Sequence, residues 1–500
     1  MLYEDVLKSP DNFDFRIPSL GECRIASPVK NRHFVGDDEE IIFASQVKNI
    51  RSLLNKSAVL PAFQKAGPRS MIFHDPAAAR AGIVTCGGLC PGLNNVIKGL
   101  VSVLFYEYGI RHISGFRYGY QGLVKKYGHA PLELSPSLVD DIHKRGGTIL
   151  SSSRGNQAAP DMVDTLEAMK INLLFCIGGD GTLRGANAIA DEIAARNAKI
   201  SVIGVPKTID NDLPLTDHSP GFGSVAKHIA LTVREMSLDN AAMGQNDFVS
   251  ILEVMGRNAG WLAASSVLAH RRDKSDDKQV RNTHYSCGAP HIVLLPEVPF
   301  NADNFIRRVE EVLKSSGHCF VVVSEGVQDE AGNYLGADTS STDAFGHAVL
   351  GGAGESLRNL VEQRFSGVKA RASKLGIAQR AASHSASKTD VDEAFLCGSE
   401  AVKAAVAGES GKMVIITRSE KENYGVKTLL APLSEIANGV KAFPDKWIGE
   451  DRMSIHPDFV RYALPLIQGE LQLPYEQGLP RYAQLSAIRV QRRLEKFVSA

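Results

Sequence analysis

One aspartate lies among glycines in a setting that suits a metal-bound polyphosphate. Asp180 belongs to the segment Gly178–Thr182, directly after the apolar run Leu173–Ile177. Because that run predicts a buried strand, the segment falls at a strand end, where open α/β sheets bind ligands. A carboxylate held there can ligate Mg²⁺ directly or through water, while Gly179 and Gly181 leave room for phosphates. The segment therefore predicts phosphoryl transfer.

A second cluster of reactive side chains follows the next apolar run along the chain. The segment Pro206–Asp212 places Lys207 and Thr208 beside two carboxylates, Asp210 and Asp212. One carboxylate can take the proton of an attacking hydroxyl, and the other can orient that hydroxyl or help to organise a metal. In isolation, a turn rich in Asp and Asn would be the better interpretation. One strand after the glycine-flanked aspartate, an acid–base site is the better one.

A third glycine-rich turn, Thr85–Asn94, lies between a predicted strand and a predicted helix. Gly87 and Gly88 would let backbone N–H groups approach a phosphate closely, and the helix N-terminus adds a favourable field. Many strand–helix turns contain glycine, so a purely structural turn is an equal interpretation of these residues alone.

Short apolar runs alternate with helical patterns from residue 81 onward, which is typical of βαβ units. The pattern predicts an α/β fold of two Rossmann-like lobes with mostly parallel sheets, plus N- and C-terminal extensions. Strands are predicted over 81–85, 173–177, 201–205, 248–254, 291–295, 318–324 and 413–417. Helical patterns cover 94–106, 183–195, 305–314, 396–407 and 484–497. Residues 372–390, rich in Ser, Ala and Lys, predict a loop or hinge.

The composition is that of a globular protein without charge bias. The 500 residues are 44% hydrophobic, and Lys+Arg and Asp+Glu number 56 each, which argues against nucleic acid and anionic membranes as partners. No apolar run reaches transmembrane length, and Met1–Ser9 lacks the apolar core of a signal peptide. The seven cysteines suit a reducing compartment, and Cys86 and Cys90 lack a neighbouring pair for a metal site. A cytoplasmic protein is expected.

From about Ala81 to about Thr417 the sequence resembles the phosphofructokinases, because the two aspartate segments occur together and in order. Further segments continue the resemblance in the order of the family: Gly146–Gly155, Glu253–Arg257, Pro296–Phe300, Ser324–Gly326, and the pair Arg371 and Arg380. The resemblance implies a glycolytic kinase that uses Mg²⁺ to transfer a phosphoryl group to the 1-hydroxyl of fructose 6-phosphate.

The resemblance also implies a role for each matching residue. Asp210 would be the general base for the 1-hydroxyl, and Asp180 would hold Mg²⁺ on the donor. Arg154 would stabilise charge on the moving phosphoryl group, assisted by Lys207, while Thr208 would position the reacting oxygens. The donor would also contact Gly87, Gly88, Gly179, Gly181 and Thr182. Fructose 6-phosphate would contact Thr208, Ile209, Asp210, Asp212, Met255, Gly256, Arg257, Glu325, Arg371 and Arg380.

The same resemblance suggests how the chain is divided. Residues 1–80 would be an extension that packs on the core or on a partner subunit. Residues 81–221 would form the phosphoryl-donor lobe, to which 379–430 return, and 222–378 the fructose 6-phosphate lobe. Residues 431–500 would be a C-terminal extension. A homo-oligomer, dimer or tetramer, with closing lobes is expected.

Two positions depart from the bacterial pattern of the family. Phe248 stands where the bacterial ATP enzymes have an arginine contributed by the neighbouring subunit, and Ile377 stands where they have a histidine. Both family residues touch the substrate phosphate, so the grip on that phosphate must differ here. Lys227, His228 and His384 are the candidates to replace them.

Two residues beside the aspartates bear on the phosphoryl donor. Gly181 leaves room for the α-phosphate of a nucleotide, where pyrophosphate enzymes usually carry a second aspartate. Lys207 points the other way, since many pyrophosphate enzymes have lysine there. Plant and protist ATP enzymes combine this glycine with this lysine, so ATP is the expected donor and pyrophosphate the alternative.

Two other function classes fit part of the sequence. A kinase of NAD or of a lipid would explain Gly178–Thr182 and would leave Pro206–Asp212 and Glu325 without a purpose. A non-catalytic regulatory subunit of a phosphofructokinase would explain the departures at Phe248 and Ile377. It would give no chemical reason to keep base, metal ligand and arginine together.

Overall fold

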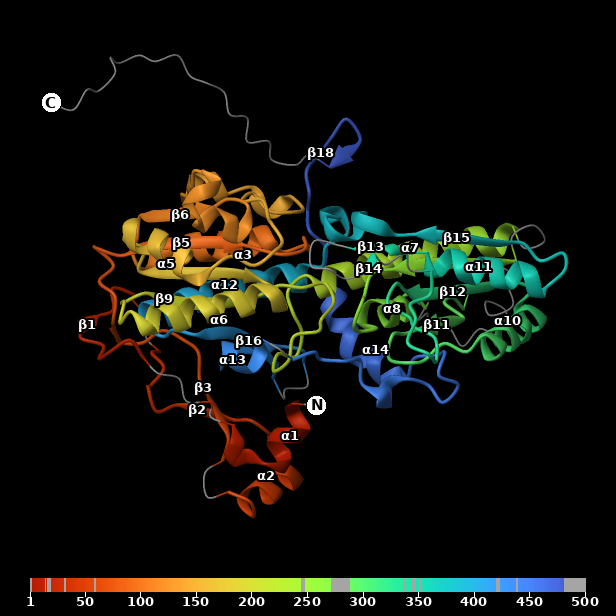
Figure 1. The fold of residues 1–500 in the computed structure, drawn as a ribbon, viewed down its shortest axis with the longest axis horizontal. Coiled ribbons are helices and arrows are strands. Elements are labelled where there is room, and N and C mark those ends of the chain that lie inside the picture. The colour runs from red at the N-terminus through yellow and green to blue at the C-terminus, as the bar shows by residue number, and fades with distance from the viewer. Residues whose placement is uncertain are drawn as a thin grey trace.

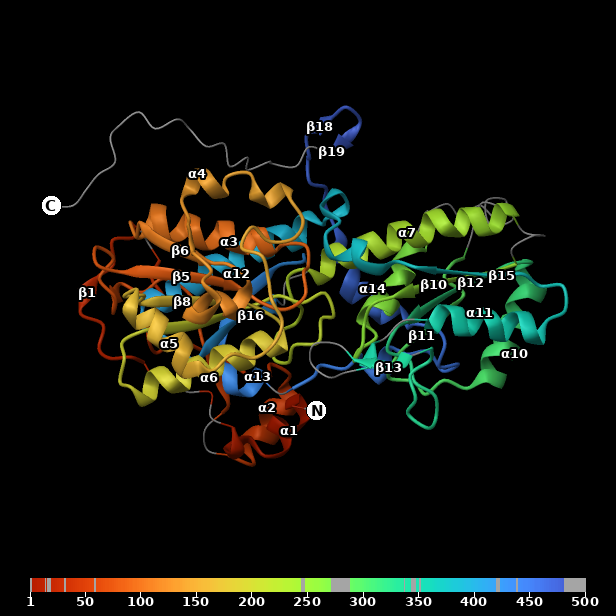
Figure 2. The ribbon, with the colours of Figure 1, turned by 45° about the horizontal axis from the view of Figure 1, so that its top comes forward.

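The fold is built on two β-sheets that lie side by side, seen here in a computed structural model (Figures 1 and 2). The structure describes residues 2–13, 15, 19–30, 33–57, 60–243, 248–270, 288–336, 338–342, 348–349, 352–419, 423–437 and 439–480. The helical pattern predicted over 484–497 lies outside these residues.

The larger sheet has seven strands, and its five inner strands run parallel. In spatial order they are β17 (Val426–Pro432), β16 (Lys412–Arg418), β9 (Ser201–Pro206), β8 (Leu173–Gly178), β5 (Arg80–Thr85), β6 (His112–Phe116) and β7 (Leu132–Glu133). The two edge strands, β17 and β7, pair antiparallel with their neighbours. The carboxyl ends of β5, β8 and β9 are therefore adjacent.

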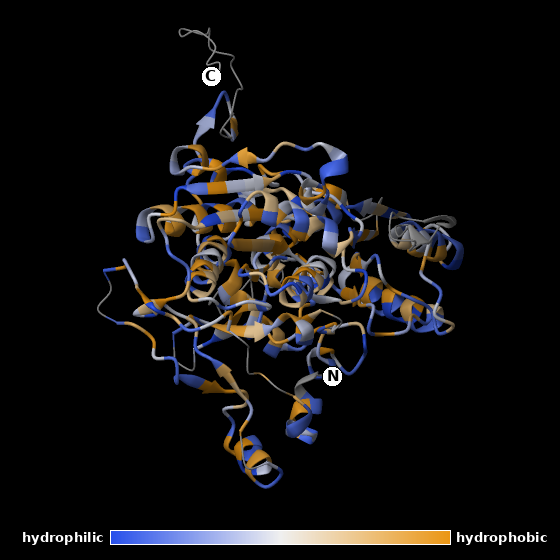
Figure 3. Cartoon of the chain, turned by 60° about the vertical axis from the view of Figure 1, so that its left-hand side comes forward, coloured by the Kyte–Doolittle hydropathy of each residue, from blue (hydrophilic) through white to orange (hydrophobic). Residues whose placement is uncertain are grey.

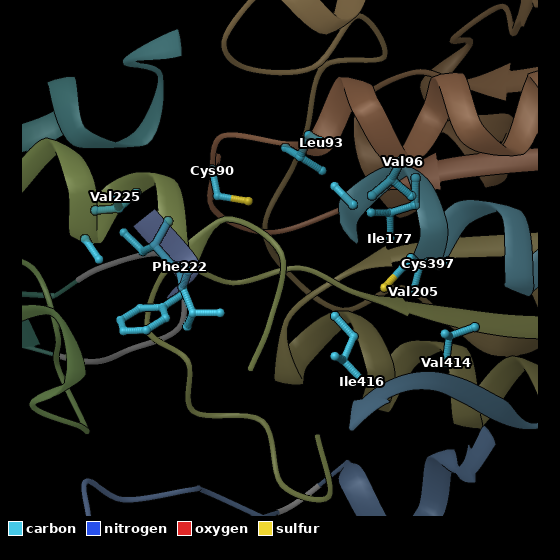
Figure 4. Close-up of a cluster of buried hydrophobic side chains, with 14 of the residues drawn as sticks. Cys90, Leu93, Val96, Ile177, Val205, Phe222, Val225, Cys397, Val414 and Ile416 are labelled. Atoms are coloured by element: carbon cyan, nitrogen blue, oxygen red, sulfur yellow. The ribbon is translucent and has the colours of Figure 1, made fainter. Parts of the chain in front are cut away.

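Helices cover both faces of this sheet because its strands are apolar on both sides. On β8, Phe175 belongs to one buried cluster, while Leu174 and Cys176 belong to another on the opposite face. Helices α3 (Leu93–Ser102) and α12 (Lys388–Val406) supply the first cluster. Figure 4 shows Leu93, Val96 and Cys397 from these helices beside strand residues. Helices α5 (Ala159–Ala168), α6 (Asp180–Ala195) and α13 (Leu433–Ile436) supply the second.

The smaller sheet has four strands, all parallel. In spatial order they are β11 (Ile292–Leu294), β12 (Cys319–Ser324), β10 (Val249–Val254) and β15 (Ala370–Lys374). Helices α10 (Ala302–Ser316) and α11 (Ala353–Arg364) pack on one face, and α7 (Phe222–Met243) and α8 (Trp261–Ser265) on the other. The cluster beneath α7 is continuous with that beneath α3 and α12, so one core joins the two sheets.

The α/β fold and every predicted strand from 81 to 417 are confirmed, with ends shifted by one residue or so. The loop or hinge predicted over 372–390 is wrong at both ends, because β15 runs to Lys374 and α12 begins at Lys388. Among the described strands, β15 pairs with β10 alone and is half exposed. Its polar residues therefore do not form the apolar run by which a buried strand is predicted. Figure 3 shows hydrophobic colour along the central strands and mixed colour on the helices around them.

The residues before β5 pack on the outer edge of the larger sheet. The strand β3 (Ala62–Gln64) pairs with β2 (Glu40–Ile42), and Lys65 forms a bridge to Leu429 of β17. Phe15, Phe43 and Phe63 stack together there, with centroids 4.8–5.7 Å apart. The N-terminal residues thus pack on the core, while the predicted lobe boundaries stay a prediction. Among the described residues, no helix is both long and apolar enough to cross a membrane.

Candidate active site

The carboxyl ends of both sheets open into one cavity of about 1050 Å³. Strands β5, β8 and β9 contribute from the larger sheet, and β10, β12 and β15 from the smaller. Its predicted lining residues are Gly87, Gly88, Arg154, Gly179, Asp180, Gly181, Thr182, Lys207, Thr208, Ile209, Asp210, Asp212, Met255, Arg257, Glu325 and Arg380. Their convergence arises because parallel strands end at the same edge of a sheet. The cavity is large enough for two substrates.

The glycine turn after β5 is fixed to the segment that carries Arg154. Gly87 has a left-handed φ of 82°, and a hydrogen bond of 3.1 Å joins its N–H to the Ser153 carbonyl. The Ser152 hydroxyl donates to the Gly87 carbonyl at 2.7 Å. A Cβ atom added to Gly88 would lie 4.0 Å from Arg154 Nη2, so guanidinium and turn face the cavity together.

Asp180 begins helix α6 and has one oxygen without a partner. Its Oδ2 pairs with Arg184 Nη2 at 3.0 Å, while the buried Oδ1 has no hydrogen-bond partner among the described residues. Burial raises the pKa of Asp180, opposed by Arg184. A half-buried carboxylate, one oxygen of which has no partner among the described residues, suits a cation that also binds donor phosphates, which is how proteins usually hold Mg²⁺. No group of three His, Cys, Asp or Glu side chains in the described residues forms a metal cage.

The loop after β9 carries the two carboxylates. Thr208 Oγ1 accepts the N–H of Asp210 at 3.1 Å, and Lys207 Nζ donates to the Gly88 carbonyl, which ties this loop to the glycine turn. Burial, Asp212 and Glu325 raise the pKa of Asp210 to about 7, against the lowering effect of Arg380 and Lys207. A carboxylate with a pKa near neutrality is suited to take a proton from a hydroxyl.

The smaller sheet supplies a mixed cluster of cations and carboxylates. Arg257 follows β10, Glu325 follows β12, and Lys374 and Arg380 follow or end β15. Burial raises the pKa of Glu325, while burial and the Arg154 guanidinium lower that of Arg380. Arg154 lies on a loop beside the larger sheet, and Arg380 follows the last strand of the smaller sheet. Both line the cavity, so their positive charges lie close together between the two sheets.

Two predicted substrate residues do not line this cavity. Arg371 lies on β15, 56% exposed, with Nη1 3.6 Å from Asp239 Oδ2. Gly256 has a φ of 126° and accepts a hydrogen bond from Ser324 Oγ at its carbonyl, so it shapes the turn before Arg257. Their predicted contacts with the substrate stay predictions.

The departures from the bacterial pattern have distinct structural settings. Phe248 packs against the apolar cluster of the smaller sheet, whereas Ile377 lines the cavity and is 77% exposed. The candidate replacements Lys227, His228 and His384 are not among the lining residues. Lys227 instead donates to the Gly469 carbonyl and pairs with Glu470 at 2.8 Å.

Sequence reasoning missed Lys374, which lines the cavity three residues before Ile377. Its Nζ lies 3.2 Å from Glu253 Oε1, and Glu253 Oε2 accepts the N–H groups of Gly352 and Gly354 at 3.0 Å. In the sequence, Lys374 stands directly before the pair Leu375-Gly376. This position predicts a site residue only when the preceding residues are recognised as the strand β15.

The sequence profile of the phosphofructokinase family matches residues 80–405, which include both aspartate segments and every lining residue from the smaller sheet. The chain belongs to the phosphofructokinase family. An ATP-dependent 6-phosphofructokinase of Amycolatopsis methanolica is 40% identical over 363 residues, 70% of this chain and 75% of the relative. A pyrophosphate–fructose 6-phosphate 1-phosphotransferase of Halomonas elongata is 41% identical over 337 residues, 67% of this chain and 77% of the relative.

Solved phosphofructokinase structures share the fold. The pyrophosphate-dependent phosphofructokinase of Marinobacter aquaeolei superposes with a TM-score of 0.71 at 32% identity, over 84% of this chain and all of that one. The corresponding enzyme of Nitrosospira multiformis also gives 0.71, at 31% identity and the same coverage. Relatives with either donor therefore resemble this chain, and kinases of NAD or lipids are not needed to explain its motifs.

Proposed function

We propose that this chain is an ATP-dependent 6-phosphofructokinase that phosphorylates the 1-hydroxyl of fructose 6-phosphate. The relatives named for ATP and for pyrophosphate both act on fructose 6-phosphate, so the family supports this acceptor more strongly than either donor. The proposal for the donor rests on the shape of the cavity.

The observation that carries the ATP proposal is the depth of the cavity along α6. Beyond the phosphate-sized space at Gly181, the lining continues through Gly185 and Ala188 of α6 and Met162 of α5. Ala188 lies seven residues past Gly181, about 10 Å along the helix axis. A Cβ atom at Gly181 would meet only Arg184 Nη2, at 3.9 Å, so there is open space beside Gly181 where the extension begins. Pyrophosphate would not use this extension, whereas a nucleoside would.

In the proposed reaction Asp210 accepts the proton of the 1-hydroxyl, and the oxygen attacks the terminal phosphorus of the donor. The bond between that phosphorus and its bridging oxygen breaks, and the charge passes to the departing diphosphate. Arg154, Lys207 and the glycine turn after β5 face the oxygens that gain charge. Asp180 would hold Mg²⁺, which neutralises phosphate charge when bound. Arg257, Lys374 and Arg380 supply positive charge for the sugar phosphate.

Two alternatives have specific support. Lys207 and the pyrophosphate-dependent relatives favour a pyrophosphate donor. A regulatory subunit without activity would be consistent with Phe248 and Ile377, although Asp180, Asp210 and Arg154 line one cavity, which favours an enzyme. A homo-oligomer stays a prediction.

The donor is tested by initial rates with ATP and with pyrophosphate at fixed fructose 6-phosphate and Mg²⁺. We expect turnover with ATP, because the lining beyond Gly181 accepts a nucleoside, and little or none with pyrophosphate. Gly181→Asp should reduce the ATP rate, since a carboxylate there would fill and charge the space beside Gly181 that the nucleotide is proposed to use. Turnover by the wild type with pyrophosphate alone would overturn the ATP proposal.

The pH profile tests the base. The pKa of Asp210 is raised to about 7 in the protein without substrate, so the basic form is lost as the pH falls through that value, and kcat/KM for fructose 6-phosphate should decrease toward acid pH. Asp212 is one cause of the raised pKa, so Asp212→Asn should shift this limb to lower pH in stopped-time assays of the product. If the acid side of the pH–rate profile is unchanged in Asp212→Asn, the assignment of Asp210 as the general base is contradicted.

A further inference from the structure

Two residues of the predicted C-terminal extension, Lys441 and Tyr462, contact the loop that carries the catalytic carboxylates. Lys441 Nζ donates to three oxygens, Asn211 Oδ1 at 3.2 Å, the Thr216 carbonyl at 3.0 Å and the Asp217 carbonyl at 2.9 Å. The Lys441 N–H donates to the Asp212 carbonyl at 2.7 Å. One lysine therefore holds the loop at four acceptors, although it is not among the cavity lining.

Asn211, between the two carboxylates, has a backbone that needs this support. Its φ of 54° lies in the left-handed region, which costs a residue with a Cβ atom, and its side chain is fully buried. Asn211 Oδ1 accepts a second hydrogen bond from the N–H of Ser219 at 3.1 Å, and Nδ2 donates to the Tyr462 hydroxyl at 3.0 Å. That hydroxyl in turn donates to the Asp217 carbonyl at 2.8 Å.

An aromatic cluster holds Lys441 and Tyr462 in place. Trp261 Nε1 donates to the Lys441 carbonyl at 2.9 Å, and Lys441 Nζ lies 5.0 Å from the centroid of the Trp261 ring. The rings of Phe443, Trp447, Phe459 and Tyr462 surround Trp261 with centroids 5.2–6.4 Å away. Both tryptophans of the chain belong to this cluster, so tryptophan fluorescence reports whether the segment is docked.

We propose that Lys441, together with Tyr462, is a positioning residue for phosphoryl transfer, which holds Asn211 in its left-handed conformation and thereby sets the distance of Asp210 from the sugar hydroxyl. This proposal rests on the proposed function. The lysine donates to the Thr216 carbonyl and adds a second hydrogen bond to Asn211 Oδ1 and to the Asp217 carbonyl, so it ties three points of the loop to the docked segment. The C-terminal segment thus supplies a part of the site that the catalytic motifs do not contain.

The test is Lys441→Met, which keeps the length of the side chain and removes the ammonium. We expect kcat to fall about tenfold to a hundredfold, because a small displacement of a reacting group has effects of that size. KM for fructose 6-phosphate should change little, since Lys441 is not among the residues that line the cavity. Tryptophan emission should shift slightly, because the ammonium lies 5.0 Å from the centroid of the Trp261 ring, but it should not become that of the unfolded chain, because the bond from Trp261 goes to the backbone of Lys441.

Lys446→Met is the matched control, since it makes the same substitution in the same segment and Lys446 is exposed, with its ammonium 5.8 Å from the centroid of the Trp447 ring. It should leave kcat near that of the wild type. Tyr462→Phe removes only a hydroxyl and should lower kcat by about two- to tenfold, which keeps the proposal testable even when Lys441→Met folds poorly. Lys441→Met with the kcat of Lys446→Met, or Tyr462→Phe with the kcat of the wild type, would overturn the positioning role alone. A wild type without turnover would overturn the proposed function and this role with it.

Discussion

Asp210→Asn is expected to lower kcat by about 10²–10⁴-fold, the contribution of a positioned general base. The amide keeps the size of the side chain and its place in the loop, but it cannot accept the proton of the 1-hydroxyl. KM for fructose 6-phosphate should stay close to that of the wild type, or fall, because a buried negative charge near the sugar is removed. Steady-state kinetics at saturating donor measure both constants.

Asp164→Asn provides the comparison for this substitution. The same substitution, Asp to Asn, is made on the same lobe. Asp164 lies outside the cavity, is 59% exposed and is paired with Arg196. Its kcat should equal that of the wild type. Equal rates for Asp210→Asn and Asp164→Asn would show that the base is another group.

Arg154→Ala is expected to have an effect of similar or larger size, a loss of about 10³–10⁵-fold in kcat. The guanidinium lies beside the glycine turn and close enough to Arg380 to lower its pKa, so it can stabilise charge on the transferring group from the junction of the two lobes. Arg154→Lys should recover only part of the rate, because an ammonium lacks the planar fork that matches phosphate oxygens. Single-turnover measurements separate this loss from slower product release.

Arg111→Ala is a suitable control for the arginine substitutions. Arg111 is exposed and lies over the Phe105 ring at 4.5 Å, away from the cavity lining. Its removal should leave kcat unchanged. A loss in Arg154→Ala no greater than that in Arg111→Ala would contradict the electrostatic role of Arg154.

Local sequence patterns predicted the part of the site that follows strands of the larger sheet. Asp180, Lys207 and Asp210 follow apolar runs within a few residues, so both the strand and its ligand-binding end are encoded in one short segment of sequence. Parallel pairing of β8 and β9 then brings the two segments together without further information.

Contacts between distant parts of the chain could not be predicted in this way. Lys374 was hidden by the polar edge strand β15, whose pattern does not alternate clearly. Lys441 meets Asn211 across 230 positions of sequence, and Lys441 carries no motif of its own. Local patterns also do not predict that Arg371 lies outside the cavity while Ile377 lines it. The positions of these two residues depend on where β15 ends.

The central claim is that this chain places a phosphoryl group on the 1-hydroxyl of fructose 6-phosphate. Phosphorus NMR of a mixture of purified protein, fructose 6-phosphate, Mg²⁺ and ATP tests it directly. We expect a second phosphate ester, at carbon 1, which forms in step with ADP and forms about 10²–10⁴-fold more slowly in Asp210→Asn. No new ester at carbon 1 with either ATP or pyrophosphate would contradict it.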